Sequence, residues 1–205
     1  MEKARREIVV RLGRAAEYRD NETGMHVIRM SNYSAALARA TQLPEEQCDL
    51  ILQASPMHDV GKIGIRDNIL LKPGKLEGDE WVNMKTHVEI GVSILSGGDS
   101  KIIQLAQEIA ATHHEKYDGT GYPNGLKGEE ISIPGRIVPI CDVFDALTSV
   151  RPYKKAWTVE DAVDLLKQEK GKHFDPDLVD RFISILPEIL EIRERYSETP
   201  LDAVA

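Results

Sequence analysis

Apolar residues recur along most of the chain with the period of an α-helix. Between Ile102 and His113 they occupy positions i, i+3, i+4, i+7 and i+8, and His113 continues this face at i+11. Similar stripes run from Trp81 to Leu95 and from residue 179 to residue 186. Alternating runs long enough for a core β-strand are absent from the sequence. The pattern therefore predicts an all-α fold in which His113 lies on an inward helical face.

Local signals mark the starts of two of the predicted helices. In the sequence FDPD, Asp175 can cap the helix that follows, and Pro176 suits the first helical position. Thr158 followed by Asp161 resembles a capping box for a helix that begins at residue 159, although Glu or Gln is the usual partner at the third position. These signals predict helix starts near residues 159 and 176.

The composition is that of an ordinary globular protein. A length of 205 residues suits one domain, or one domain with a small appendage. The formal net charge of −8 argues against duplex nucleic acid or an anionic membrane as a general partner, although a locally basic site can still bind a small anion. Cys48 and Cys141 lack metal-ligand spacing and indicate a reducing compartment. Because no apolar run reaches membrane-span length and the N-terminus lacks a signal-peptide core, we expect a cytoplasmic protein.

Histidines and carboxylates form the most informative pattern in the sequence. Two adjacent imidazoles, His113 and His114, precede a glycine-rich turn in HHEKYDGTGYPNG. Asp142 and Asp145 are the only charges in IVPICDVFDAL, a segment that is otherwise typical of a buried helix. A buried carboxylate is costly unless it is paired or bound to a metal. Taken singly, such residues have ordinary explanations, namely a core histidine, a helix cap or a coincidence of spacing.

A shared metal centre explains most of these groups together. Five of the six histidines lie close to carboxylates or on inward helical faces: His26, His58, His87, His113 and His114. His173 has no carboxylate pattern around it and is interpreted as a structural or loop residue. Imidazole and carboxylate ligands suit iron, manganese, zinc or nickel. The five imidazoles and three carboxylates make eight groups, more than one six-coordinate ion can use. We therefore expect two or three bridged ions, with Asp59 as the candidate bridge, an arrangement suited to phosphoester hydrolysis.

Six segments, in this order, resemble the HD-GYP domain family. They are HDVGKIGI (His58–Ile65), ILLKPGKL (Ile69–Leu76), MKTHVEIG (Met84–Gly91), HHEKYDGTGYP (His113–Pro123), DVFDALTSVRPYK (Asp142–Lys154) and FDP (Phe174–Pro176). This family is a subclass of the HD-superfamily phosphohydrolases that cleaves the bacterial messenger cyclic di-GMP. The resemblance runs from about Arg14 to about Leu186 and implies a helical bundle of the HD-domain type with a metal centre in its core.

The resemblance also implies roles for individual residues. The implied metal ligands are Glu22, His26, His58, Asp59, His87, His113, His114 and Asp142. Asp59 and Lys62 would act in catalysis, with Lys62 stabilising negative charge on the scissile phosphate. The implied substrate contacts are Asp145, which would hold a guanine edge or orient Arg151, and the cations Arg151 and Lys154. Gly121, Tyr122 and Pro123 would form an exposed lip that contacts a protein partner, or alternatively a stiff turn that only shapes the loop.

Three positions depart from the usual family pattern. Arg66 stands where proline is common, and Tyr117 stands where tryptophan is frequent. Pro139 lies three residues before Asp142 and would shift the start of the helix that carries this aspartate, because proline removes a backbone donor. None of the three is an implied ligand, so the metal centre is still expected.

The expected activity is metal-dependent hydrolysis of cyclic di-GMP to pGpG in bacterial second-messenger signalling, with further conversion to GMP left open. Iron or manganese is the favoured metal, and zinc, nickel or magnesium are the alternatives. Two other functions stay open. One is a catalytically weak ligand-binding or protein-docking module, and the other is an HD phosphohydrolase that acts on another nucleotide.

The resemblance also predicts how the chain is divided. The expected parts are a linker-like helix (1–13), an HD-GYP domain (14–192) and a C-terminal tail (193–205). The first helix has only a thin apolar stripe of Val9, Leu12 and Ala16, which indicates weak packing. It would connect to a receiver or sensor domain upstream, or it would be a solvated terminal helix. The sequence also leaves a homodimer open.

Overall fold

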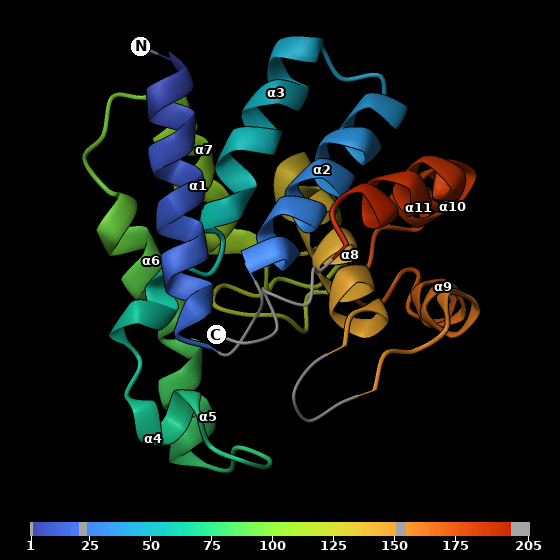
Figure 1. The fold of residues 1–205 in the computed structure, drawn as a ribbon. Coiled ribbons are helices and arrows are strands. Elements are labelled where there is room, and N and C mark those ends of the chain that lie inside the picture. Colours follow the sequence, from blue (N-terminus) through green and yellow to red (C-terminus); the bar gives the residue numbers. More distant parts are fainter. Residues whose placement is uncertain (1, 21–23, 151–154, 198–205) are drawn as a thin grey trace.

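Helices form the regular structure of the described residues, 2–20, 24–150 and 155–197, in this computed structural model (Figure 1). In chain order they are α1 (Glu2–Tyr18), α2 (Gly24–Ala40), α3 (Glu45–Ala54), η1 (Ser55–Met57), η2 (Val60–Gly64), α4 (Asp67–Leu70), α5 (Asp79–Lys85), α6 (His87–Leu95), α7 (Lys101–Thr112), η3 (Gly128–Glu130), α8 (Ile133–Thr148), α9 (Val159–Gln168), α10 (Pro176–Ser184) and α11 (Leu186–Arg195), where η denotes a 3₁₀-helix. Among these residues the only β pairing is an isolated bridge between Lys170 and Phe174. The predicted all-α fold is confirmed.

The centre of the bundle is formed by α2 and α8, which pack against each other. Figure 1 shows α1 and α9 on opposite sides of this pair. Tyr33 of α2 and Phe144 of α8 are fully buried, and their rings meet edge to face with centroids 6.0 Å apart. Phe182 of α10 extends this contact, 5.0 Å from the Phe144 ring. Because each aromatic side chain buries a large apolar area, the cluster fixes α2 and α8 relative to each other.

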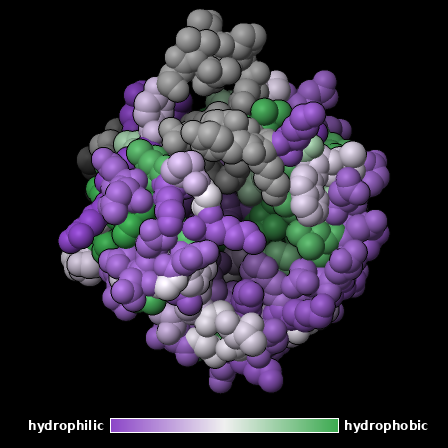
Figure 2. Space-filling model, turned by 90° about the horizontal axis from the view of Figure 1, so that it is seen from below, coloured by the Kyte–Doolittle hydropathy of each residue, from purple (hydrophilic) through white to green (hydrophobic). Residues whose placement is uncertain are grey.

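The surface and the core differ as expected for a globular protein. Figure 2 shows hydrophilic side chains over most of the face seen from below, with smaller hydrophobic patches between them. Cys48 and Cys141 are both free thiols buried in the core. Among the described residues, every helix is too short or too polar to cross a membrane.

Both predicted N-cap residues are confirmed, but at Thr158 the Asp161 carboxylate accepts from the Thr158 hydroxyl at 2.8 Å in place of the main-chain bond of a full capping box. The Asp175 carboxylate accepts hydrogen bonds from the main-chain N–H groups of Asp177 and Leu178, at 2.9 and 3.3 Å. The Thr158 hydroxyl accepts a hydrogen bond from the Asp161 N–H at 3.1 Å. Each cap satisfies helix donors that have no partner within the helix.

The stripe from Trp81 to Leu95 is divided between two helices, α5 and α6, which meet at Thr86. At this point two side chains bind helix carbonyls. The Thr86 hydroxyl donates to Asn83 O at 2.6 Å, and the His87 ring lies 2.7 Å from Met84 O through Nδ1. Such bonds compete with the regular helical ladder, so an unbroken apolar period does not guarantee one continuous helix.

The start of α8 is not displaced by Pro139, so the expected shift is wrong. The helix begins at Ile133, six positions earlier, and Pro139 lies inside it. Ser132 caps this start by accepting from the Gly135 N–H at 3.4 Å. The helix thus starts at its own cap, and the proline removes one internal donor without moving that end.

The first helix packs more closely than its thin stripe predicted. Val9 and Ala16 are buried, whereas Leu12 is about half exposed. A Cβ atom at Gly13 would lie only 2.2 Å from Pro56 O, so α1 rests directly against η1. Residues 13 and 14 lie within this one helix, and residues 192 and 193 lie within α11. Neither expected domain boundary coincides with a break between helices.

Candidate metal centre

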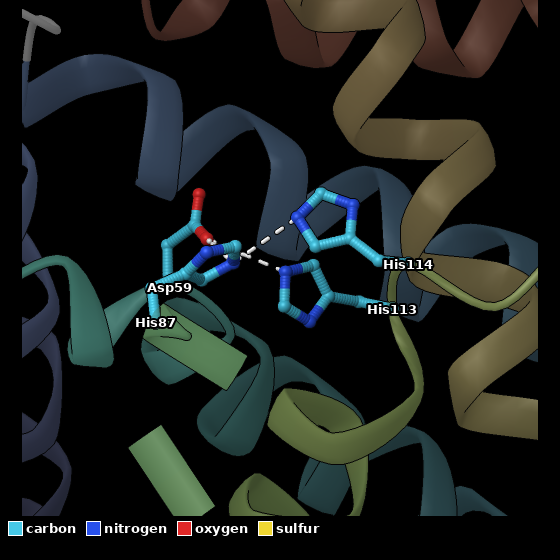
Figure 3. Close-up of side chains that lie close together, drawn as sticks. All are labelled: Asp59, His87, His113 and His114. Carbon is cyan, nitrogen blue, oxygen red and sulfur yellow. Dashed lines mark hydrogen bonds and ion pairs between the residues drawn. The ribbon is translucent and has the colours of Figure 1, made fainter. Parts of the chain in front are cut away.

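Three segments bring four potential metal ligands to one point (Figure 3). Asp59 comes from the turn before η2, His87 from the start of α6, and His113 and His114 from the end of α7. Asp59 Oδ1 lies 3.3 Å from Nε2 of both His87 and His113. Nε2 of His114 lies 3.1 Å from Nε2 of His87. One ligand atom of each residue falls within 4.8 Å of all the others, a spacing that one ion can span.

A second group lies beside the first and includes Glu17, His26 and His58. Glu17 Oε1 is 3.8 Å from His26 Nε2. Asp142 faces the same point, because its Oδ1 lies 3.1 Å from His26 Nε2 and 4.0 Å from His58 Nε2. The His58 Nε2 atom is in turn 3.3 Å from Oδ2 of Asp59. The two oxygens of Asp59 therefore face different groups, which is the position of a bridging carboxylate.

The imidazoles are oriented by hydrogen bonds on their outer nitrogen. In His58, His87 and His113, Nδ1 lies 3.0, 2.7 and 3.1 Å from the main-chain oxygen three residues earlier. In His26, Nδ1 lies 2.8 Å from the Asp145 carboxylate. Since these oxygens only accept, each Nδ1 carries a proton, and each Nε2 faces the centre, where it binds a metal ion through its lone pair once it carries no proton of its own.

Several of these inward atoms are buried without a hydrogen bond. Within the described residues this holds for Nε2 of His58, Nε2 of His113 and Oδ1 of Asp59. Buried polar atoms are nearly always satisfied, and borderline divalent ions bind imidazole and carboxylate. The donor set therefore fits divalent metal ions.

Burial and charge adjust the protonation of these groups. Burial alone would raise the pKa of Asp59, but the charges of Lys62 and His58 outweigh it and hold that pKa well below its usual range. Burial lowers the pKa of His113 and holds that of His114 well below its usual range, so both rings stay neutral. Burial would also lower the pKa of His58, but the Asp59 carboxylate overcomes it and raises this pKa to about 9. A metal ion bound at His58 must therefore displace a proton.

The structure gathers most of the ligands implied by the sequence. Seven of them come together: His26, His58, Asp59, His87, His113, His114 and Asp142. Glu22 lies outside the described residues. Glu17 was missed, although it is buried and lies in the second group. Its signal is an acidic residue at the inward position of the helical period that starts at Val9 and continues through Ala16.

Lys62 lies at the edge of the centre. Its ammonium is 2.9 Å from Asp59 Oδ2 and 2.5 Å from the Asp20 carboxylate. This places a fixed positive charge beside the candidate bridge, where the expected role of Lys62 requires it.

Asp145 occupies a different position from the one expected. Its side chain is fully buried, and Arg29 binds it through two parallel contacts, Nε to Oδ1 at 2.7 Å and Nη2 to Oδ2 at 2.8 Å. The same carboxylate orients the ring of His26. Asp145 therefore supports a ligand and has no surface with which to contact a guanine. The other two expected substrate contacts, Arg151 and Lys154, lie outside the described residues.

The glycine-rich turn is built around Glu115, another residue that sequence reasoning missed. Glu115 is buried, and its carboxylate accepts from the main-chain N–H groups of Asn124 and Leu126, at 2.8 and 3.0 Å. A Cβ atom at Gly121 would lie 2.3 Å from Lys116 N, so only glycine fits there. The turn is thus folded back onto the end of α7.

Tyr122 of this turn packs onto the metal centre. Its ring stacks on the His114 ring with centroids 4.7 Å apart, and its N–H donates to His114 O at 3.1 Å. Lys85 Nζ lies 4.8 Å from the centroid of the Tyr122 ring. Of the expected lip, Pro123 is exposed, whereas Gly121 and Tyr122 are partly buried. Tyr122 thus shields one candidate ligand from solvent.

Comparison with known families identifies the fold. The family model described as "HD domain" matches residues 9–178. The chain belongs to the HD-domain family. A 3'3'-cGAMP-specific phosphodiesterase 2 of Vibrio cholerae is 50% identical over 188 residues, which cover 92% of this chain and 36% of that protein. The cyclic di-GMP phosphodiesterase response regulator RpfG of Xanthomonas campestris is 46% identical over 197 residues, covering 96% of this chain and 52% of that protein.

Solved structures show the same HD-domain fold. The Vibrio cholerae cyclic GMP-AMP specific phosphodiesterase V-cGAP3 superposes with a TM-score of 0.68 at 18% identity, over 97% of this chain and 52% of that one. Bd1817, an HDG"Y"P protein of Bdellovibrio bacteriovorus, gives 0.61 at 21% identity, over 79% of this chain and 51% of that one. The resemblance to the HD-GYP family is confirmed. The chain spans only about a third to a half of the two relatives described above.

Proposed function

We propose that this chain is the catalytic domain of a metal-dependent phosphodiesterase that opens cyclic di-GMP to pGpG, with further conversion to GMP left open. The observation that carries the proposal is the placement of Asp59 between two groups of inward-facing imidazoles. Two ions bridged by one carboxylate are a recurrent device for phosphoester hydrolysis. Several relatives are named as cyclic di-GMP phosphodiesterases, which supports this substrate.

Two ions would be held by the two groups of side chains. His87, His113 and His114 would bind one ion, and Asp59 would be shared. The other would be bound by Glu17, His26, His58 and Asp142. Iron or manganese fits this mixture of imidazole and carboxylate ligands. A third ion would draw on Glu22, which the family resemblance adds to the set.

Divalent ions bound in this centre would supply the Lewis acidity needed for water to attack phosphorus and for the ribose oxygen to leave. Lys62 holds its ammonium next to Asp59 and would stabilise the charge that develops on the phosphoryl oxygens. Tyr122 covers His114 and limits the access of bulk water to that side. Arg151 and Lys154 remain predicted contacts to the phosphates of the substrate.

A second substrate has specific support. The relative with 50% identity is named as specific for 3'3'-cGAMP, a cyclic dinucleotide in which adenine replaces one guanine. Both substrates present the same phosphodiester to the metal centre, so the centre itself does not discriminate between them. A side-by-side assay of cyclic di-GMP and 3'3'-cGAMP decides which of the two dinucleotides the domain prefers.

The same comparisons also bear on the larger protein in which this domain would act. The Xanthomonas relative is named as a response regulator, which supports the proposal that this domain acts within a longer regulator that carries a receiver or sensor domain. Partner binding at the Gly121–Pro123 lip remains a proposal of the family resemblance, and formation of a homodimer stays open.

The test is product formation from each dinucleotide by the chain reconstituted with manganese or iron. The expected result is pGpG from cyclic di-GMP, at a rate that falls at least about a hundredfold when His58 and Asp59 are both replaced by alanine. His173→Ala is the matched control, since His173 lies outside both ligand groups. Binding of either dinucleotide without product over a long incubation would instead identify a docking module.

A further inference from the structure

We propose that Arg19 and Asp20, at the end of α1, are positioning residues that hold the Lys62 ammonium beside Asp59 of the metal centre. The inference rests on the proposed function, because it assigns the support of a residue whose charge that function requires. It concerns two side chains that contact Lys62 or the turn that carries it. Both residues directly follow α1, a helix outside the HD motif itself.

The Arg19 guanidinium binds the turn that carries Lys62. It donates to the main-chain oxygens of Lys62 at 3.2 Å, Ile63, and Ile65 at 2.6 Å, and to the Asp67 carboxylate at 2.8 Å. The carbonyls at the end of a helix have no partner within it. One planar guanidinium with several donors can satisfy them together, so Arg19 fixes the end of η2 to the end of α1.

Asp20 holds the charged end of the same lysine. Its carboxylate lies 2.5 Å from Lys62 Nζ, and Asp59 Oδ2 lies 2.9 Å away on the side of the metal centre. The lysine side chain is only 15% exposed. A free lysine samples many rotamers, and ordering it costs free energy at the moment of reaction. Because two carboxylates already hold the ammonium before substrate binds, the free energy of ordering the side chain is not added to the reaction barrier.

The first helix is a firm support for these contacts. Gly13 lies against Pro56 O so closely that no Cβ atom fits, and Val9 and Ala16 are buried. Glu17, two residues before Arg19, belongs to the second group of candidate ligands. A displacement of α1 would therefore move Lys62, its turn and one candidate ligand together. The position of this helix thus controls the centre.

Two readouts test the inference on the full chain. The variants are Arg19→Gln, Arg19→Lys and Asp20→Asn, and Arg14→Gln is the matched control because Arg14 is an exposed arginine of the same helix. The first readout, which needs no turnover, is hydrogen exchange at the Lys62 and Ile65 amides, which bond within the turn at 3.0 and 3.1 Å. The second readout compares kcat with KM for cyclic di-GMP, with metal content measured in parallel.

Arg19→Gln should speed exchange at the two amides about tenfold and lower kcat about tenfold, with KM changed less than about twofold. Arg19→Lys should restore part of both, since one ammonium cannot reach every carbonyl of the turn. Asp20→Asn should lower kcat and leave exchange near the parent value. The control should match the parent in both readouts.

Unchanged exchange in Arg19→Gln, or faster exchange with the parent kcat, would overturn the inference. To separate it from the proposed function, bis(p-nitrophenyl) phosphate serves as a second substrate. A parent that cleaves only this ester refutes the assigned dinucleotide, and the kcat comparison then uses the ester. A parent that cleaves neither ester overturns both proposals.

Discussion

The replacement of Glu115 by alanine is expected to loosen the glycine-rich turn that covers the metal centre. In the native chain the buried carboxylate accepts two main-chain hydrogen bonds, from Asn124 at 2.8 Å and from Leu126 at 3.0 Å. A hydrogen bond to a charged group contributes roughly 1.5–3 kcal/mol. The loss of both is therefore expected to lower the free energy of unfolding by about 3 kcal/mol or more.

Glu115→Gln provides a graded comparison. The amide keeps one oxygen acceptor and replaces the other by a donor that faces an N–H group. We expect this variant to lose about half as much, roughly 1.5 kcal/mol. Glu108→Gln is the charge-matched control, because Glu108 is exposed on α7, the helix that ends three residues before Glu115. It should stay within about 0.5 kcal/mol of the parent.

The assay combines denaturant unfolding with hydrogen exchange at the Asn124 and Leu126 amides. Exchange should accelerate at both amides in the alanine variant, because both lose their acceptor, and less in the glutamine variant, which keeps one of the two acceptor oxygens. If Glu115→Ala unfolds at the same urea concentration as the parent and both amides exchange at the parent rate, the reasoning about the buried carboxylate is refuted.

Three further predictions follow from close contacts elsewhere. Gly13→Ala should destabilise the chain by about 1–3 kcal/mol in a urea titration, since its Cβ would lie 2.2 Å from Pro56 O; an unchanged midpoint would show that α1 is not seated as described. Arg29→Met leaves Asp145 buried without its cation and should cost about 3–5 kcal/mol, and a loss below about 1 kcal/mol would contradict the pairing. Burial lowers the pKa of His173 to about 4, so between about pH 6.5 and 4 the unfolded chain binds a proton at this ring and the folded chain does not. The free energy of unfolding should therefore fall as the pH drops through this range. An NMR titration of the His173 ring with a midpoint above about 6 would contradict this.

The sequence predicted those parts of the fold that depend on neighbouring residues. The cap at Asp175 was found because the capping carboxylate and its N–H partners lie within three residues. The division of the 81–95 stripe was not found, because it depends on the Thr86 hydroxyl and the His87 ring, which bind carbonyls of the preceding turn. Hydrophobic period reports which face is buried and carries no information on this competition.

The sequence indicated which residues belong to the candidate site better than it indicated how their side chains are arranged. Asp142 and Asp145 lie three residues apart on one apolar helix, and their spacing does not say which of them faces the metal centre. Packing turns Asp142 towards the centre and Asp145 towards Arg29, a partner 116 residues away in the chain. Glu17 was missed for the same reason, because its proximity to His26 depends on the angle at which α1 meets α2.

The central claim is that separated imidazoles and carboxylates converge to hold divalent ions, and elemental analysis of the purified chain tests it most directly. The parent should retain iron or manganese through gel filtration, and the His58→Ala, Asp59→Ala double variant should lose most of it while remaining folded. A parent that retains no divalent metal after reconstitution, or a folded double variant that retains as much as the parent, would contradict the account.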